Sequence, residues 1–203
     1  MDTHYKLAIF DIGNTLFAID MEGIVRYLAA LTQHSVAEVS HLLRPDETYA
    51  LFETGKISET NFCQHLSEQL GYPLSVNEFR MAWNNIFGDI FPEIPAILQN
   101  LRCHKTRIVA LSNTNITHER AFMQLYPELM LLFDEIYCSH HLHLAKPDIA
   151  IYEKVMAYEK AHPQEAIFFD DKAENVRAAQ DVGIHSVLAI PNENIQNPLF
   201  HSS

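Results

Sequence analysis

Short apolar runs that end in small or polar residues recur along this chain. The first covers residues 5–10 (YKLAIF) and stops at Asp11 and Gly13, a pattern typical of a buried strand followed by a turn. Similar runs follow at residues 106–111 (TRIVAL), 135–138 (EIYC), 166–169 (AIFF) and 186–190 (SVLAI). These runs predict five short strands.

Helical patterns separate the strands from about residue 90 onward. They cover residues 92–102, 117–132, 148–160 and 172–182, and Gly183 marks the end of the last one. Alternation of strand and helix is the signature of a parallel sheet with helices on both faces. We therefore predict an α/β fold with a doubly wound parallel sheet. The polar segment 192–203 is expected to be loosely held.

Residues 18–87 break this alternation, because they contain only helical patterns. Four helices are predicted, at residues 22–31, 36–43, 58–70 and 75–87, and Ser75 followed by Glu78 has the spacing of a capping box. We predict that residues 18–87 form a helical cap domain over the carboxyl ends of the sheet, and that residues 1–17 and 88–203 form the α/β core domain. The large apolar side chains of this segment recur at near-helical spacing and are assigned to the interior of the cap: Phe62, Phe79, Met81, Trp83 and Phe87.

Composition narrows the range of partners. The chain has 203 residues, enough for one well-buried domain or a core with a modest insertion. Its 26 acidic and 14 basic residues give a net charge of -12, which repels a nucleic-acid backbone or an anionic membrane. We expect neither as a partner. A small phosphate ester remains compatible, because local amides, a lysine and a metal ion can outweigh the global field within a cleft. The oligomeric state is left open.

The spacing of the cysteines and the length of the apolar segments indicate the cellular compartment. Cys63, Cys103 and Cys138 are odd in number, far apart and without CxxC spacing, which argues against a disulfide framework and against a zinc site. No apolar stretch approaches the roughly 20 residues that cross a bilayer, and residues 1–7 lack the plan of a signal peptide. We expect a cytoplasmic protein.

Polar side chains follow or flank the predicted strand ends. They are Asp11 after the first strand, Ser112 and Asn113 after residues 106–111, Lys146 before Pro147, and Asp170 with Asp171 after residues 166–169. Since the carboxyl ends of the strands in a doubly wound sheet share one edge, we expect these side chains to face one pocket.

Such a set has the parts for metal-assisted phosphoryl transfer. Asp11 is the candidate nucleophile, because a free aspartate titrates near about 3.9 and is ionised at neutral pH. Asp171, helped by Asp170, is expected to hold Mg²⁺, which binds through few carboxylates and keeps water and phosphate oxygens as its other ligands. Ser112, the backbone amides near it and Lys146 are expected to bind the phosphate oxygens and offset their charge.

The runs FDIGNTL, LSNTN, AKP and FFDD, in that order, resemble the four motifs of the haloacid dehalogenase-like hydrolase superfamily. The opening FD-x-GN with LSNTN, KP-x-x-x-IY and FFDD resembles a bacterial branch that contains a glucose-1-phosphate phosphatase. The resemblance implies a Rossmann-like core with a helical cap inserted after the first motif, and phosphoric monoester hydrolysis. It also implies that Asp11 forms an aspartyl-phosphate, that Asp11, the carbonyl of Gly13 and Asp171 ligate magnesium, and that Ser112 and Lys146 hold the phosphate.

One departure concerns the proton donor. Most phosphatases of the superfamily carry a second aspartate two residues after the nucleophile, which protonates the leaving oxygen, and this chain has Gly13 there. A general acid is worth roughly 10²- to 10⁴-fold in rate. An anomeric sugar hydroxyl is more acidic than an ordinary alcohol, so sugar 1-phosphates suit a site without that donor. Other donors considered are a water molecule and three side chains near the first motif: Asp20, His34 and His41.

Three other functions stay open at this point. A haloacid dehalogenase also uses an aspartate nucleophile, but it needs no metal, so Asp170 and Asp171 argue against it. A catalytically silent sugar-phosphate-binding protein is compatible with Gly13. A phosphomutase is disfavoured, because it needs the acid and base that Gly13 cannot supply.

A histidine cluster, HHLH, contains His140, His141 and His143. It has no i, i+4 spacing and no acidic residue near it in the sequence, so we interpret it as a solvated polar loop rather than a metal site.

Overall fold

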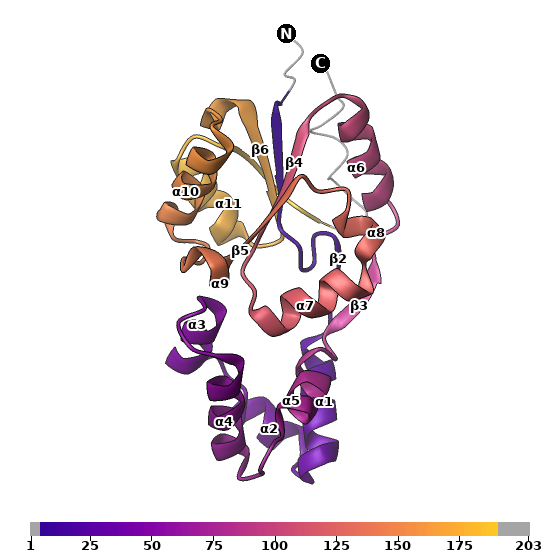
Figure 1. Cartoon of the computed structure of the whole chain (residues 1–203), viewed down its shortest axis with the longest axis vertical. Coiled ribbons are helices and arrows are strands. Elements are labelled where there is room, and N and C mark those ends of the chain that lie inside the picture. The colour runs from indigo at the N-terminus through magenta and orange to yellow at the C-terminus, as the bar shows by residue number, and fades with distance from the viewer. Residues whose placement is uncertain (1–4, 191–203) are drawn as a thin grey trace.

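A five-stranded parallel sheet forms the centre of the computed structural model, which describes residues 5–190 (Figure 1). The strands are β1 (Leu7–Phe10), β4 (Arg107–Ser112), β5 (Glu135–Cys138), β6 (Ala166–Asp170) and β7 (His185–Leu188), in the spatial order β5-β4-β1-β6-β7. Every neighbouring pair runs parallel. The predicted fold class and all five predicted strands are confirmed. The segment 192–203, predicted to be loosely held, lies outside the described residues.

Helices cover both faces of the sheet. One face is covered by α6 (Ile94–Cys103), α7 (Ile116–Leu125) and α8 (Pro127–Met130), and the other by α9 (Ser139–Leu142), α10 (Ile149–Glu159) and α11 (Ala173–Asp181). A short 3₁₀ helix, η1 (Pro163–Glu165), precedes β6. Phe10 and Phe169 enter the first apolar layer, whereas Ile9 and Phe168 enter the second. This alternation follows from the period of two along a strand, and it explains why the central strands β1 and β6 are apolar at nearly every position.

The helix predicted over residues 117–132 is divided in the structure. α7 ends at Leu125, and α8 begins with Pro127 as its first residue. A proline inside a helix removes one backbone donor and clashes with the preceding turn, whereas the first helical position accepts it readily. The prediction of one continuous helix was therefore wrong at Pro127.

The inserted segment contains five helices rather than the four predicted. They are α1 (Met21–Thr32), α2 (Val36–Leu42), α3 (Glu47–Glu53), α4 (Glu59–Leu70) and α5 (Val76–Trp83). The missed helix, α3, is seven residues long and starts where the Asp46 carboxylate accepts a hydrogen bond from the N–H of Tyr49 at 2.7 Å. The predicted capping box of Ser75 and Glu78 is present. In Figure 1 these helices form a group of their own beyond the carboxyl ends of the strands.

The cap has its own apolar cluster. Phe62, Phe79 and Trp83 are buried in it, and Phe87 packs against it while partly exposed, as predicted. Met81 was wrongly assigned to this interior, because its side chain is 54% exposed. Phe79 and Trp83 are four residues apart and share one face of α5, and a residue two positions from Phe79 points to the opposite face.

Two short strands connect the cap to the core. β2 (Phe17–Ile19) and β3 (Phe87–Ile90) pair antiparallel as a separate two-stranded sheet. Neither strand is predicted from the sequence, because three or four residues are too few to show a strand period. The predicted domain boundaries, at residues 17/18 and 87/88, fall at this pair of strands and stay a prediction.

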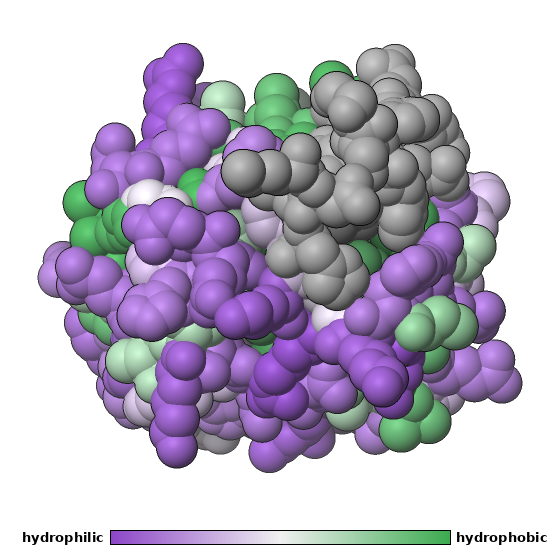
Figure 2. All heavy atoms as spheres, turned by 90° about the horizontal axis from the view of Figure 1, so that it is seen from above, coloured by the Kyte–Doolittle hydropathy of each residue, from purple (hydrophilic) through white to green (hydrophobic). Residues whose placement is uncertain are grey.

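The surface of the described residues agrees with the acidic, polar composition. Seen from the end opposite the cap, it is mostly hydrophilic, with isolated hydrophobic residues (Figure 2). Within residues 5–190, no helix has the length and apolar character needed to cross a membrane.

Candidate active site

The predicted site residues meet at the carboxyl edge of the sheet. β1 lies between β4 and β6, so the side chains that follow these three strands are neighbours in space. They border a cavity of about 150 Å³ that lies between the core and the paired strands β2 and β3. Of the predicted residues, Asp11, Gly13, Ser112, Asn113, Lys146 and Asp171 line this cavity. Asp170 lies behind them and is fully buried.

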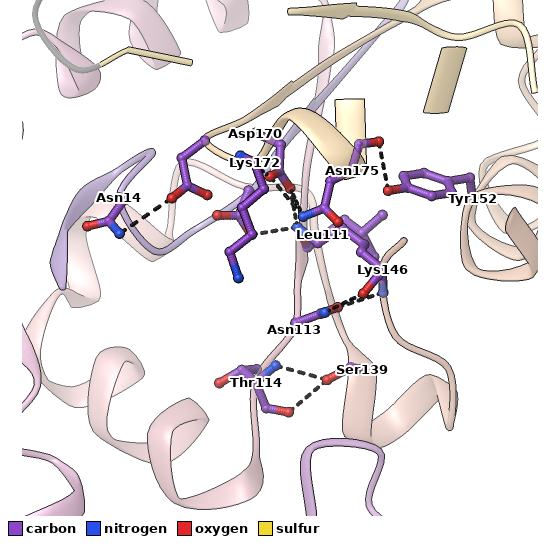
Figure 3. A network of polar contacts seen from close by, with 12 residues as sticks. Asn14, Leu111, Asn113, Thr114, Ser139, Lys146, Tyr152, Asp170, Lys172 and Asn175 are labelled. Atoms are coloured by element: carbon purple, nitrogen blue, oxygen red, sulfur yellow. Dashed lines mark hydrogen bonds and ion pairs between the residues drawn. The ribbon is translucent and has the colours of Figure 1, made fainter. Parts of the chain in front are cut away.

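Lys146 is the centre of the polar network in Figure 3. Its Nζ donates to Asp11 Oδ1 at 2.6 Å, to Asp170 Oδ2 at 2.6 Å and to the carbonyl of Leu111 at 2.7 Å. The side chain is 1% exposed. Burial opposes its charge, but the two carboxylates outweigh burial and raise the pKa of Lys146 above its ordinary value. The ammonium group is therefore held between two buried carboxylates.

Asn113 holds the backbone of Lys146. Its side-chain Nδ2 donates to the Lys146 carbonyl at 2.8 Å, and its Oδ1 accepts from the Lys146 N–H at 2.8 Å (Figure 3). Both ends of the side chain are thus engaged by the segment that carries the lysine.

Asp11 is anchored by its backbone and buried by its surroundings. Its N–H donates to the carbonyl of Phe169 at 2.8 Å, which extends the β1–β6 pairing up to the candidate nucleophile. Burial raises the pKa of Asp11 to about 6, Lys146 opposes this rise, and the nearby carboxylates of Asp170 and Asp171 add to it. Asp11 therefore remains mostly ionised at neutral pH.

The two aspartates of the FFDD run have different surroundings. Asp170 accepts four hydrogen bonds, from Lys146 Nζ, the Lys172 N–H and twice from Asn175 Nδ2. Asp171 faces the cavity and accepts one bond, from Asn14 Nδ2 at 3.4 Å. Burial raises the pKa of Asp171, with Asp170 adding to the rise. Asp170 thus points at the lysine and Asp171 at the cavity.

The acidic side chains present here fit a magnesium ion. One carboxylate oxygen each from Asp11, Asp170 and Asp171 lies within 4.8 Å of the others. The donors are all oxygen and the site adjoins an open cavity, so water and substrate oxygens can complete the octahedral shell that Mg²⁺ requires.

A side chain at position 13 would crowd Ile19 of β2. A Cβ atom added to Gly13 would lie 3.0 Å from Ile19 Cγ1, closer than ordinary van der Waals contact. The structure does not bring the three other candidate donors to the cavity. Asp20 pairs with Arg26 at 2.5 Å, His34 Nδ1 lies 3.0 Å from Thr32 Oγ1, and His41 is on the exposed side of α2.

Several side chains that line the cavity are not predicted from the sequence. Its apolar wall consists of Ile12, Phe17, Ile19, Phe87 and Phe122. His118 also lines the cavity, where its Nε2 donates to the carbonyl of Trp83 at 3.0 Å. Burial lowers the pKa of His118 to about 4, so this imidazole is neutral. The one local signal for His118 is the helix start at Asn115, whose side chain caps α7.

The interpretation of the histidine cluster was wrong in two respects. His140 and His141 belong to the short helix α9, and His140 is 7% exposed, so the segment is not a solvated loop. Both imidazoles contact an acidic residue, Glu119 of α7, at about 3 Å. Glu119 lies about 20 positions earlier in the sequence, and its side chain reaches the two imidazoles only in the folded protein.

A parallel α/β sheet with helices inserted after its first strand, and a cavity at the carboxyl edge of that sheet, define the class of fold. A family model for haloacid dehalogenase-like hydrolases matches residues 5–183, so the chain belongs to this family. The predicted family and enzyme class are confirmed.

Curated relatives extend over nearly the whole chain. The chain is 32% identical over 186 residues to the sesquiterpene phosphatase astK of Aspergillus oryzae, an alignment that covers 91% of this chain and 89% of that protein. It is 24% identical over 189 residues to a D-ribitol-5-phosphate phosphatase of Bacteroides thetaiotaomicron, with 89% and 90% coverage.

Solved structures agree with the fold and with the predicted cofactor. A haloacid dehalogenase family enzyme from Bacteroides thetaiotaomicron, solved with magnesium and inorganic phosphate, superposes with a TM-score of 0.84 at 25% identity, covering 97% of this chain and all (100%) of that one. An L-2-haloacid dehalogenase from Xanthobacter autotrophicus superposes with a TM-score of 0.65 at 18% identity, covering 90% and 76%, and shows the shared fold alone.

Proposed function

We propose that this protein is a magnesium-dependent phosphatase that hydrolyses a small phosphate ester through an aspartyl-phosphate on Asp11. The observation that carries the proposal is that Asp11 and Asp171 face the same cavity while Lys146 contacts Asp11 at 2.6 Å. A nucleophile, a place for a cation and a fixed positive charge are what phosphoryl transfer requires of a protein.

The chemistry assigns a role to each side chain. A carboxylate oxygen of Asp11 attacks phosphorus, the bond between phosphorus and the ester oxygen breaks, and the leaving oxygen takes a proton from water to depart as the alcohol. A second water then hydrolyses the aspartyl-phosphate to release inorganic phosphate. The hydroxyl of Ser112 binds a phosphate oxygen. The ammonium of Lys146, whose three N–H groups donate to Asp11, Asp170 and the Leu111 carbonyl in this structure, binds another by turning one donor from its present acceptor. Because the Asn113 side chain is engaged with Lys146, we assign the predicted phosphate contact of Asn113 to its backbone amide.

Magnesium, when bound, offsets the negative charge of the phosphate next to the carboxylate nucleophile. Asp11, the Gly13 carbonyl and Asp171 are the proposed ligands. Asp170 was predicted to help hold the metal, but its four hydrogen bonds favour a different role, in which it positions Lys146.

Two observations suggest different leaving groups. Gly13 favours an ester whose alcohol is acidic, such as a sugar 1-phosphate. The five apolar residues along the cavity favour an apolar alcohol, and the relative named as a sesquiterpene phosphatase carries that second possibility. The relative named for ribitol 5-phosphate shows that a polyol phosphate is also within the range of similar chains.

A phosphate-release assay tests the proposal. The protein is incubated with magnesium and three esters: glucose 1-phosphate, glucose 6-phosphate and a farnesyl monophosphate. We expect release that needs magnesium and is lost in Asp11→Asn. Equal turnover by Asp11→Asn would rule out the nucleophile, and binding without release from any ester would favour the catalytically silent binding protein. Halide release from a haloacid in the presence of a chelator would favour the dehalogenase instead.

The cellular compartment is also part of the proposal. Cys63, Cys103 and Cys138 are free thiols. We retain the cytoplasm as the place of action and a small phosphorylated molecule as the partner, with neither nucleic acid nor membrane as a partner.

A further inference from the structure

A second group of metal-binding side chains lies outside the catalytic cavity. It consists of Glu119 on α7 and of His140 and His141 on α9, and one donor atom from each lies within 4.8 Å of the others. His140 Nε2 is 3.0 Å from Glu119 Oε2, and His141 Nε2 is 2.9 Å from the same oxygen. Both imidazoles therefore point a ring nitrogen at one carboxylate.

The contacts of His140 leave one of its two ring nitrogens without a proper partner. Its Nδ1 lies 3.1 Å from the carbonyl oxygen of Thr114, and its Nε2 faces the Glu119 carboxylate. Both partners are acceptors, and a neutral imidazole carries one N–H, so either tautomer directs a lone pair at an oxygen. Since the His140 side chain is 5% exposed, water has little access to relieve this conflict. A cation next to Nε2 removes it.

We propose that Glu119, His140 and His141 bind a divalent transition-metal ion, with Zn²⁺ the best chemical match. Two imidazoles and a carboxylate are a ligand set for zinc rather than for magnesium, which prefers oxygen alone. Bonds of about 2.0–2.1 Å in a tetrahedron place two ligands roughly 3.3 Å apart, and the nitrogen–oxygen distances here, 2.9–3.1 Å, are within a few tenths of that value.

The surroundings complete such a site. When Nδ1–H of His140 donates to the Thr114 carbonyl, Nε2 is free to bind the metal. Zinc-binding histidines commonly make such a hydrogen bond with the ring nitrogen that does not contact the metal. The thiol of Cys138 lies 3.7 Å from Glu119 Oε1 and helps to orient the carboxylate. His141 is 55% exposed, so the fourth position of the tetrahedron opens to water.

The ion would link α7 to α9, next to the segment at the end of β4 that carries Ser112 and Asn113. Thr114 follows Ser112 and Asn113, and its carbonyl accepts from both Ser139 Oγ, at 2.8 Å, and His140 Nδ1. Ser139 Oγ also lies 2.6 Å from the carbonyl of Glu53, the last residue of α3 in the cap. Metal binding here therefore stabilises the contact between cap and core without supplying a catalytic group.

Cobalt and zinc binding to the full-length protein tests this site, with excess Mg²⁺ present to fill the acidic cluster. We expect one equivalent of Co²⁺ to give the visible absorption of a tetrahedral site, Zn²⁺ to displace it, and Zn²⁺ to raise the unfolding temperature. Glu119→Gln and His141→Gln should weaken binding by more than the roughly 10- to 100-fold that loss of an outer partner costs. His141 is exposed, so its replacement leaves folding intact.

His143→Gln is the matched control. His143 belongs to the same HHLH run but contacts the Thr54 carbonyl instead of Glu119, so this variant should bind Co²⁺ like the parent protein. The proposal is overturned if the parent protein binds neither ion under excess Mg²⁺, or if Glu119→Gln and His141→Gln bind as tightly as the parent. It is also overturned if nuclear magnetic resonance shows His140 as an imidazolium in the presence of Zn²⁺, because a proton then satisfies both acceptors.

Discussion

Asn113 and Lys146 are joined by a reciprocal pair of hydrogen bonds, 2.8 Å each, between the side-chain amide of one and the backbone of the other. The pair links the end of β4 to the loop that carries the lysine, across 33 positions of sequence. The Lys146 side chain starts from a backbone fixed in this way, and its ammonium then reaches Asp11 and Asp170. Asn113 thus acts on the reaction through the placement of Lys146.

Replacing Asn113 by alanine is expected to reduce kcat by about 10²-fold, the cost of a displacement of about 1 Å in a catalytic group. KM for the ester should change less, because the residue does not hold the alcohol part. Steady-state phosphate release at saturating magnesium measures both constants. Asn100→Ala, at an exposed position on α6, serves as the control, and a kcat for Asn113→Ala equal to that of this control would show that Lys146 is positioned by other contacts.

Asp170, the last residue of β6, and Asp171, which follows it, are expected to affect different properties of the protein when replaced by asparagine. Asp171→Asn removes a proposed metal ligand that faces the cavity, so activity should require a higher Mg²⁺ concentration while the free energy of unfolding changes little. Asp170→Asn removes one of the two carboxylates that flank a buried ammonium, which is expected to cost about 3–5 kcal/mol of stability.

Magnesium titration of activity and urea unfolding of both variants provide the measurement. Asn175→Ala is a useful companion, because Asn175 donates to both oxygens of Asp170 and should share its stability phenotype in weaker form. The opposite pattern, a magnesium requirement raised by Asp170→Asn and not by Asp171→Asn, would exchange the two roles.

The fold could be predicted from the sequence because its three central strands, β1, β4 and β6, are buried on both faces. Residues 166–170, for example, are all buried, and such a run shows its character without any partner. The pairs Asp11–Lys146 and Asp170–Lys146 were predicted only as neighbours at one edge. That Asp170 faces the lysine and Asp171 the cavity depends on the side-chain direction at the end of β6, which alternates with each residue.

The parts that could not be predicted depend on contacts between distant segments. Glu119 contacts His140 through their side chains, across 21 positions of sequence, and no spacing in the sequence reports this contact. β2 and β3 are too short for their own sequences to indicate a strand, and each forms because it pairs with the other. His118 lines the cavity because β3 and α7 lie together, so it carries no motif of its own.

Stability without metal should depend on pH through Asp11. Burial raises the pKa of Asp11 to about 6 in the folded protein, whereas an unfolded aspartate titrates near about 3.9. Because the folded state holds this proton more tightly, the folded protein loses stability as pH rises from about 4 to about 6, and the loss is complete above that range. Asp11→Asn has no such proton to lose.

Thermal unfolding in a chelator, from pH 4 to pH 7.5, tests this expectation. The unfolding temperature of the parent protein should fall relative to that of Asp11→Asn across the window, and added Mg²⁺ should reverse the difference at neutral pH. A difference between the two proteins that stays constant from pH 4 to pH 7.5 would contradict the raised pKa of Asp11.

The missing proton donor can be restored by design, because the contact that blocks it is known. A Cβ on Gly13 would lie 3.0 Å from Ile19 Cγ1, so Gly13→Asp alone should be poorly accommodated. Combining it with Ile19→Ala removes the obstructing methylene. Only an ester with a poor leaving group needs a general acid, so the double variant should hydrolyse glucose 6-phosphate faster than Ile19→Ala does, by up to roughly 10²- to 10⁴-fold. It should gain much less on glucose 1-phosphate, whose leaving hydroxyl is more acidic. Turnover of the two isomers by Ile19→Ala, with and without Gly13→Asp, gives the comparison; an equal gain on both esters would mean that the new carboxylate acts through metal binding rather than through proton donation.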